Sequence, residues 1–313
     1  SSKYIPVTKD MLRSIRKTSI RQILAQVHYN LPKEHFERGI LMLGGSTHLN
    51  FNGTYFEGDL SGITTGNIPF WFQHFYKPGK RISRERDWLV KLDEIVASAN
   101  KWNISTICGV PSWVQILIEK IIEHHKVNVI HDVWPNLSIY VHGGVSFAPY
   151  KKGFEKLLAR PIIYMETYLA SEGFIAYHDN PGSDGMCMVL DNGIFFEFVP
   201  FTDKNFDAEG NLKSNPETLS LAEIQDNTQY ALLLSTCAGA WRYLLGDTIK
   251  FTSPDKHEIV ITGRTKHFLS LCGEHLSQDN MNSAIELVAR DLNIHIKEFS
   301  VTGISSSPLF AHK

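Results

Sequence analysis

The stretch ISTICGVPSWVQILIEKIIEHH, residues 104–125, followed at 137–144 by LSIYVHGG, decides the fold class. Residues 104–110 form a short apolar run, which is typical of a buried strand. Residues 111–125 begin with a proline and then repeat apolar residues at three- and four-residue spacings, which predicts a helix. The apolar run at 137–144 predicts a second strand. Strand, helix and strand in this order favour a βαβ unit and a parallel sheet.

The same alternation extends to both sides of this unit. The segment 47–67 differs, because it is polar, glycine-rich and aromatic, and it predicts a loop or short hairpin that could line a site. Thr8 is a candidate cap for the first helix. The remaining spacings predict helices at 8–28, 88–100 and 148–158, and strands at 39–43 and 161–165.

The chain beyond residue 173 has a different pattern, with short apolar runs separated by turn residues and little helix between them. This pattern favours antiparallel strands, so the α/β part is followed by a β-rich part. The predicted strands are at 174–178, 186–190, 193–200, 229–236, 248–252 and 258–262.

A small α+β unit begins after the β-rich part. Residues 263–292 predict a short strand, a glycine turn and a helix from about Ser277, and a strand follows at 294–304. One helix and one or two strands are too few elements to bury one face. We therefore expect a large N-terminal domain over 1–271, with mixed sheets and flanking helices, and the start of a truncated C-terminal domain over 272–313.

Composition and charge exclude several classes of protein. The formal net charge of −2, with 31 Lys and Arg against 33 Asp and Glu, offers no basic field for nucleic acid or for an acidic membrane surface. No apolar run approaches the roughly 18 residues of a membrane span. The four cysteines are far apart and lack metal-ligand spacing, so a reduced cytoplasmic compartment is expected.

Four polar clusters stand at the ends of predicted strands, where open α/β sheets bind ligands. Gly143 and Gly144 in HGGVS (142–146) let a backbone approach a ring or a phosphate, or only form a tight turn. In TYLASEG (167–173), Glu172 needs a positive partner, a metal or the solvent of an exposed turn.

The other two clusters are WRYLLGD (241–247) and GRTKHFLS (263–270). Asp247 could accept hydrogen bonds from a diol such as ribose, or belong to an ordinary turn. Arg264 and Lys266 could face phosphate, or be solvated at a loop. The P-loop, HExxH, GxSxG and GxGxxG signatures are absent from the sequence.

The order of these clusters along the chain resembles that in adenylate-forming enzymes. The residues within the clusters resemble the motifs of one branch of these enzymes. TYLASEG looks like the YxxSE motif, and WRYLLGD like the YRxGD motif, of the Gretchen Hagen acyl acid amido synthetases, the auxin-responsive promoter family. The segments at 133–150, 193–201 and 263–277 resemble the same family, so the resemblance covers essentially the whole chain.

The resemblance implies the adenylate-forming fold and an ATP- and Mg²⁺-dependent reaction. A carboxylic acid would be adenylated with release of pyrophosphate, and an amine such as an amino acid would then displace AMP. Carried over residue by residue, the implied nucleotide contacts are Gly143 and Gly144 (adenine and acyl end), Tyr168 (adenine), Ser171 (phosphate), Glu172 (Mg²⁺), Asp247 (ribose) and Arg264 (ribose or phosphate).

The sequence also departs from the family's pattern. Of the first motif, a serine-threonine-glycine loop ending in lysine, only Ser1, Ser2 and Lys3 could remain, so the start of the domain is expected to be missing. Tyr243 and Asp247 match the third motif if one extra residue is allowed between them; aligned on Gly246 and Asp247, which we prefer, Leu244 stands where the motif has arginine. Arg242 is the nearest cation that could compensate. His275 stands where plant members commonly carry a lysine, and a neutral imidazole would hold phosphate less firmly.

The acid, the amine and the oligomeric state are not identified by the sequence. Phe70 and Trp113 are candidate acyl-binding residues in aromatic segments, although aromatic residues at such spacings are more often part of a core. Two other functions share the motifs: an inactive nucleotide-binding relative that acts as a binding or regulatory protein, and an adenylating enzyme that passes its acyl group to a thiol.

Overall fold

The computed structural model describes residues 4–266, 269–271, 274–276, 278–292, 294 and 296. Its centre is one 11-stranded mixed sheet, in the order β10-β11-β12-β13-β9-β8-β7-β6-β5-β1-β4. The strands of this sheet are β1 (Gly39–Met42), β4 (Tyr76–Lys77), β5 (Ile104–Gly109), β6 (Ile139–Gly143), β7 (Ile163–Ala170), β8 (Gly173–Tyr177), β9 (Met186–Met188), β10 (Ile194–Pro200), β11 (Gln229–Thr236), β12 (Tyr243–Ser253) and β13 (Glu258–Arg264).

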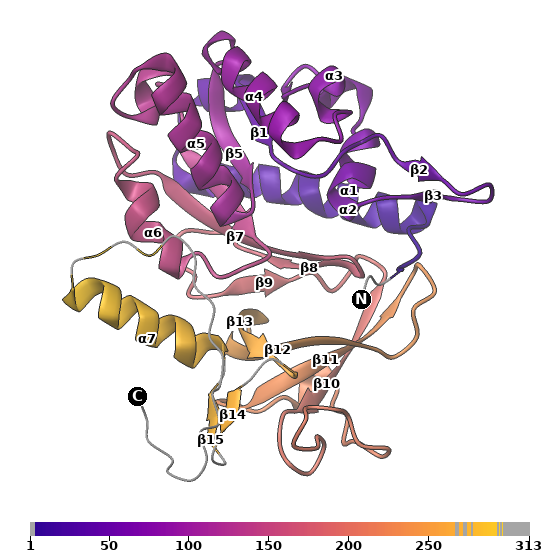
Figure 1. Ribbon diagram of the computed structural model, residues 1–313. Helices are drawn as coiled ribbons and strands as arrows, with labels where there is room; N and C mark the ends of the chain where they lie inside the picture. Colours follow the sequence, from indigo (N-terminus) through magenta and orange to yellow (C-terminus); the bar gives the residue numbers. More distant parts are fainter. Residues whose placement is uncertain are drawn as a thin grey trace.

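One half of the sheet is parallel, as the sequence predicts. β4, β1, β5, β6 and β7 all pair in parallel, and helices cross over between them. Figure 1 shows this half with its helices in the upper part of the molecule. The helices of the chain are α1 (Lys9–Ala25), α2 (Leu60–Gly66), α3 (Lys80–Ser83), α4 (Trp88–Ser98), α5 (Pro111–His125), α6 (Ala148–Glu155) and α7 (Gln278–Asp291).

The antiparallel half continues from the same sheet. β7 pairs in parallel with β6 on one side and antiparallel with β8 on the other, so it joins the two halves. From there β8, β9, β13, β12, β11 and β10 are antiparallel neighbours. The predicted change from an α/β part to a β-rich part is confirmed, and both parts share one hydrogen-bonded sheet.

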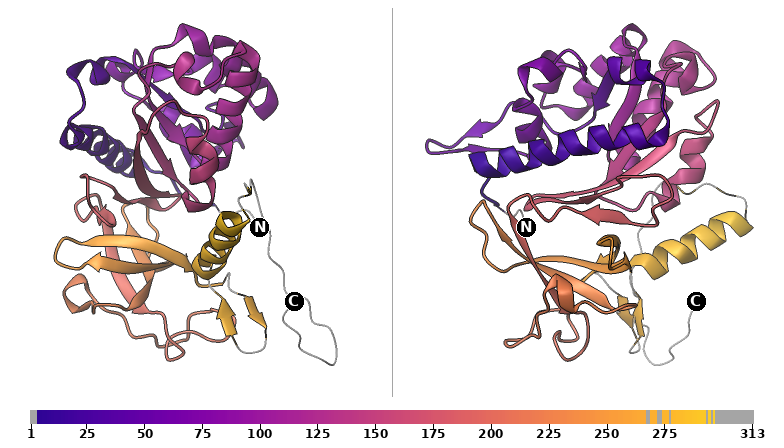
Figure 2. Two further views of the ribbon diagram at one scale, coloured as in Figure 1. Left: turned by 90° about the vertical axis from the view of Figure 1, so that its left-hand side faces the viewer. Right: turned by 180° about the vertical axis from the view of Figure 1, so that it is seen from behind.

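Helices cover both faces of the parallel half. Alternate residues of β6 separate the two sides: Tyr140 joins the core cluster of α4, α5 and α6, whereas Ile139 and Val141 join a second cluster on the opposite face. α1 packs on β8, where Met11 and Ile15 meet Phe174. Figure 2 shows the sheet between α1 on one side and α5 and α6 on the other. This layering leaves the carboxyl edge of the parallel strands open for a site.

Several local predictions are confirmed. The Thr8 hydroxyl accepts a hydrogen bond from the backbone N–H of Met11 at 3.2 Å and so caps α1, as expected. Residues 111–125 form α5, with Pro111 in its first turn. α7 begins at Gln278, where a helix from about Ser277 is predicted. The boundary between domains at 271 and 272 stays a prediction.

The segment 47–67 is only partly as predicted. It forms the hairpin of β2 (Asn50–Phe51) and β3 (Phe56–Glu57), but it also contains α2, which the sequence analysis missed. A Cβ at Gly62 would lie 2.1 Å from the carbonyl oxygen of Ser46, so this helix needs glycine to pack on the loop after β1. Tertiary packing overrides the poor helix propensity of a segment rich in Gly and Thr.

Residues after 266 add β14 (Leu269–Leu271) and β15 (Glu274–Leu276), which form a hairpin, and α7. The strand predicted at 294–304 lies almost entirely outside the described residues. None of the described helices is long and apolar enough to cross a lipid bilayer.

Candidate functional site

Gly143 and Gly144 end β6 at the carboxyl edge of the sheet, and the structure requires glycine at both positions. A Cβ at Gly143 would lie 2.3 Å from the carbonyl oxygen of Thr167 on the neighbouring strand β7. Gly144 has a φ of +84°, which favours glycine, and the nearest atom to its Cβ position is Val110 Cγ2 at 3.6 Å. The backbone therefore passes β7 closely and leaves room beside Gly144.

Tyr168, Asp247 and Arg264 meet although they are far apart in the sequence. The Tyr168 hydroxyl donates a hydrogen bond to Asp247 Oδ2 at 2.6 Å. Arg264 Nε forms an ion pair with Asp247 Oδ1 at 3.2 Å. The three residues come from β7, β12 and β13, and Asp247 lies directly opposite Arg264 in the register of β12 and β13. Two contacts therefore fix the orientation of the Asp247 carboxylate.

Burial helps to keep the Tyr168 hydroxyl protonated. The Tyr168 side chain is 6% exposed, and its burial, the Asp247 charge and the hydrogen bond to Asp247 together raise the pKa of Tyr168 well above its ordinary value. Tyr168 is therefore a hydrogen-bond donor throughout the physiological range. The Asp247 side chain is 20% exposed, so the carboxylate still reaches solvent.

Glu172 lies in the turn between β7 and β8, and it is not a solvated turn residue. It is 1% exposed, and its charge also raises the pKa of Tyr168, which puts it in the same electrostatic environment. Ser171, directly before it, is exposed at the same turn. The alternative of an exposed turn with Glu172 in water is therefore wrong.

The position of Asp247 corrects one prediction. The sequence places it at the end of a strand, whereas it lies inside β12, which runs without interruption from Tyr243 to Ser253. Gly246 has a φ of +90° and the register shifts between Thr248 and Ile249, so the strand is irregular at this point. This irregularity has no clear signature in a short apolar segment.

Leu244 and Arg242 have contacts of their own. Leu244 packs against the apolar cluster of Val199, Phe206, Ala231 and Leu233. Arg242 Nε forms an ion pair with Glu197 Oε2 at 3.0 Å. The cation that contacts Asp247 is therefore Arg264, and Arg242 is held at Glu197.

Other predicted residues are not part of this group. Phe70 is 89% exposed and lines no cavity described here. Ser1, Ser2 and Lys3 lie outside the described residues. His275 belongs to β15, of which the structure describes the backbone only.

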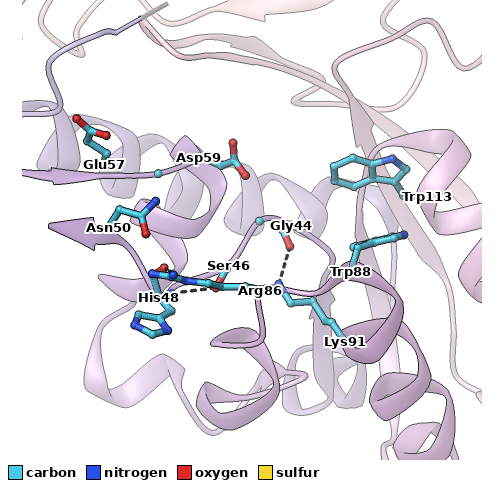
Figure 3. Close-up of a pocket in the computed structure, with 12 residues that line it drawn as sticks. Gly44, Ser46, His48, Asn50, Glu57, Asp59, Arg86, Trp88, Lys91 and Trp113 are labelled. Atoms are coloured by element: carbon cyan, nitrogen blue, oxygen red, sulfur yellow. Dashed lines mark hydrogen bonds between the residues drawn. The ribbon is translucent and has the colours of Figure 1, made fainter. Parts of the chain in front are cut away.

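A cavity of about 430 Å³ lies at the same edge of the sheet, beside the ends of β1 and β5. Its volume falls in the usual range for small-molecule sites. Trp113, a predicted acyl-binding residue, lines it, and its ring lies 4.9 Å from that of Trp88. Figure 3 shows the lining residues. They are Gly44, Gly45, Ser46, His48, Asn50, Glu57, Gly58, Asp59, Arg86, Trp88, Lys91 and Trp113.

The charged residues of this cavity were missed by the sequence analysis. Lys91 is 4% exposed, and its ammonium donates a hydrogen bond to the Gly44 carbonyl oxygen at 3.2 Å. Burial lowers the pKa of Lys91, while Glu85 and Asp59 act in the opposite direction. The sequence does contain a signal for the burial of Lys91, because this residue lies one turn before Ile95 on the apolar face of its helix.

A metal site built from protein side chains alone is not found in the part of the chain that the structure describes. No group of three or more His, Cys, Asp or Glu side chains there could hold an ion. Mg²⁺ does not need such a group, because it commonly binds through one or two carboxylates, waters and substrate phosphates.

Two family models match the chain. The GH3 family N-terminal domain matches residues 92–161, and the GH3 family central domain matches residues 187–262. The chain is thus similar to two domains of the GH3 family over these two stretches. The GH3 central domain covers β9 to β12 and most of β13, and thereby includes Asp247.

The chain is also similar to amido synthetases of plants. The chain is 24% identical over 222 residues to indole-3-acetic acid-amido synthetase GH3.4 of Arabidopsis thaliana, covering 67% of this chain and 36% of that one. It is 26% identical over 191 residues to jasmonoyl–L-amino acid synthetase JAR4 of Nicotiana attenuata, covering 58% and 32%. The chain thus spans about a third of the length of these GH3 relatives.

Solved structures agree with the fold. GH3.15 acyl acid amido synthetase superposes with a TM-score of 0.72 at 13% identity, over 95% of this chain and 62% of that chain. A 2-hydroxyisobutyryl-CoA ligase in the postadenylation state gives a TM-score of 0.60 at 12% identity, over 90% and 54%. The predicted adenylate-forming fold is confirmed.

Proposed function

We propose that this protein is a member of the GH3 family and an ATP-dependent acyl acid amido synthetase. In the first half-reaction a carboxylate oxygen attacks the α-phosphorus of ATP, the bond to the β-phosphate oxygen breaks, and pyrophosphate leaves. In the second, an amine nitrogen attacks the acyl carbon of the acyl-adenylate and AMP leaves. An amino acid with an ammonium group releases two protons in forming the amide. No residue of the chain needs to become covalently modified.

The group around Asp247 fits the nucleotide. A carboxylate has about four acceptor positions, so Asp247 can contact Tyr168 and Arg264 and still accept two hydroxyl hydrogens from a ribose. The space beside Gly144 suits the close approach of a ring or phosphate. Tyr168 has little exposed ring surface, so we propose that it acts chiefly by orienting Asp247.

The turn between β7 and β8 would serve the phosphates. Ser171 is exposed and can donate its hydroxyl hydrogen to a phosphate oxygen. Mg²⁺ would be held by Glu172 together with phosphate oxygens, and when bound it supplies positive charge that offsets the approach of two anions. Arg264, at 45% exposure of its side chain, can add a second cation at the ribose or phosphates.

The acyl group would lie against Trp113. Val110, the residue before α5, contacts the position beside Gly144, and Trp113 follows in the first turn of the same helix. Trp113 therefore lines the cavity from a helix whose start lies beside the proposed nucleotide position. The relatives named above act on indole-3-acetic acid and jasmonic acid, so apolar or aromatic acids are the first candidates. The exposure of Phe70 gives its acyl-binding role no support.

The contact of Tyr168, Asp247 and Arg264 beside the buried Glu172 carries this proposal. The test is acid-dependent exchange of labelled pyrophosphate into ATP, on the full-length protein, with a panel of carboxylic acids. We expect exchange with at least one acid and loss of exchange in Glu172→Gln. Exchange that is absent with every acid, while ATP still binds, would refute the catalytic claim.

An inactive nucleotide-binding relative is the second candidate, and Leu244 is the observation that favours it. Leu244 takes the place of the motif's arginine in β12 and packs in an apolar cluster, so this position provides no cation. Arg264 nevertheless provides a cation to Asp247, which favours the enzyme. We further propose a cytoplasmic protein that uses a carboxylic acid and an amino acid and binds neither nucleic acid nor membrane.

A further inference from the structure

The cavity beside β1 and β5 carries opposite charges on facing sides. Figure 3 shows Glu57 and Asp59 along one side, Arg86 and Lys91 along the other, and Trp88 and Trp113 at one end. The charges of these two carboxylates and two cations sum to zero. A ligand that matches such a lining has both a positive and a negative group, together with an apolar part.

Lys91 has donors to spare for an anion. Among the described residues, the carbonyl oxygen of Gly44 is the acceptor of its single hydrogen bond. An ammonium has three N–H donors, so two remain for a ligand. Because the residue is 4% exposed, these donors act in a region of low dielectric, where a bound carboxylate gains more than it would in water.

Asp59 is the matching anionic group. It is the N-cap residue of α2, where an aspartate normally accepts a hydrogen bond from the start of its helix, yet its side chain makes no such bond. Within the described part of the chain, its carboxylate accepts no hydrogen bond from any residue. The Asp59 side chain can occupy its position because residue 45 is glycine; a Cβ at Gly45 would lie 2.5 Å from Asp59 Oδ2.

We propose that this cavity binds the acceptor amino acid as a zwitterion. The α-carboxylate would lie at Lys91 and Arg86, the α-ammonium at Asp59, and an aromatic or large apolar side chain at Trp88, beside the acyl group at Trp113. A simple acid would face Asp59 with a like charge, and a simple amine would leave Lys91 without an anion. The zwitterion satisfies both sides.

The position of the cavity agrees with an acceptor site. This step rests on the proposed function, in which the amine must meet the acyl carbon next to the nucleotide. The cavity lies at the ends of β1 and β5, and the glycines proposed for the nucleotide end β6, the next strand. Trp113 lines the cavity and follows Val110, which contacts the position beside Gly144, so an amine in the cavity would lie near the proposed acyl position.

Three probes of the same shape test the proposal by titration of tryptophan fluorescence in the full-length protein. Phenylalanine carries both charges, phenethylamine lacks the carboxylate, and 3-phenylpropionate lacks the ammonium. We expect phenylalanine to bind at least about tenfold more tightly than either analogue, because each missing charge removes a charge-assisted hydrogen bond.

Two variants assign the charges. In Lys91→Met the preference for phenylalanine over phenethylamine should fall, because Arg86 alone then faces the carboxylate, and in Asp59→Asn the preference over 3-phenylpropionate should disappear. Lys120→Met and Asp93→Asn are matched controls, because these residues form an exposed ion pair at 3.4 Å outside the cavity and should not change the titrations. Asp59 is exposed, so its variant remains informative if Lys91→Met does not fold.

The outcomes separate this proposal from the proposed function. Selective binding of phenylalanine that depends on Lys91 and Asp59 supports the site even if no acid promotes pyrophosphate exchange. Equal affinity for the three probes, no saturable binding of phenylalanine, or selectivity unchanged by both variants overturns the site, even in a protein that exchanges pyrophosphate normally.

Discussion

Tyr168→Phe removes one hydroxyl group and leaves the packing of the ring in place. The hydroxyl donates to the Asp247 carboxylate at 2.6 Å, and hydrogen bonds to charged groups contribute about 1.5–3 kcal/mol to stability. Asp247 is 20% exposed and keeps its ion pair with Arg264, so we expect the lower end, a loss of about 1.5 kcal/mol in the free energy of unfolding. Because Asp247 is then held by one contact, the KM for ATP in pyrophosphate exchange should rise by up to about tenfold.

Tyr164→Phe is the matched control on the same strand. The Tyr164 hydroxyl is buried and has no hydrogen-bond partner among the described residues, so its removal should change the unfolding free energy by less than about 0.5 kcal/mol. Both variants are compared with the unchanged protein by urea unfolding and by exchange kinetics. If Tyr168→Phe is as harmless as Tyr164→Phe in both assays, the assignment of Tyr168 as the orienting partner of Asp247 is refuted.

Three further predictions follow from the same structure. Glu172→Gln keeps the size of the side chain, and it should lower exchange by at least about 100-fold while the circular dichroism spectrum stays unchanged; near-normal exchange contradicts a metal-binding role. Gly143→Ala would place a Cβ 2.3 Å from the Thr167 carbonyl oxygen and should destabilise the fold by about 1–3 kcal/mol in urea unfolding, with no loss as the contradictory result. Burial lowers the pKa of both His35 and His142 to about 4, so the neutral forms stabilise the fold above pH 6.5, and stability should fall between pH 6.5 and 4; a flat profile in that range, measured by urea unfolding, rejects this.

The elements with strong local signals could be predicted from the sequence. The spacing of apolar residues and the proline at its start define α5, and Thr8 marks the start of α1. The parallel half follows from the strand and helix order at 104–144, because parallel neighbours need a crossover. Helix α2 could not be predicted in this way, because its formation depends on the contact of Gly62 with the loop after β1.

The candidate nucleotide site could be predicted only as a set of separate residues. Nothing in the local pattern indicates that Tyr168 donates to Asp247, since 79 positions separate them and the contact depends on how β7 and β12 lie in the sheet. The irregular strand around Gly246 also hides the place of Asp247 inside β12. Lys91 was overlooked because a single lysine on a helix is usually solvated, and its burial arises from packing against the loop at Gly44.

The central claim is that the protein joins a carboxylic acid to an amino acid at the expense of ATP. Mass spectrometry of the products from a mixed panel of acids and amino acids, with the full-length protein and Mg²⁺-ATP, tests it most directly. The account predicts an amide whose mass is that of one acid and one amino acid less one water, formed with an equal amount of AMP and in more than one turnover per protein. AMP-forming turnover that yields a thioester on addition of a thiol and no amide, or no product with any pair while ATP binds, would contradict it.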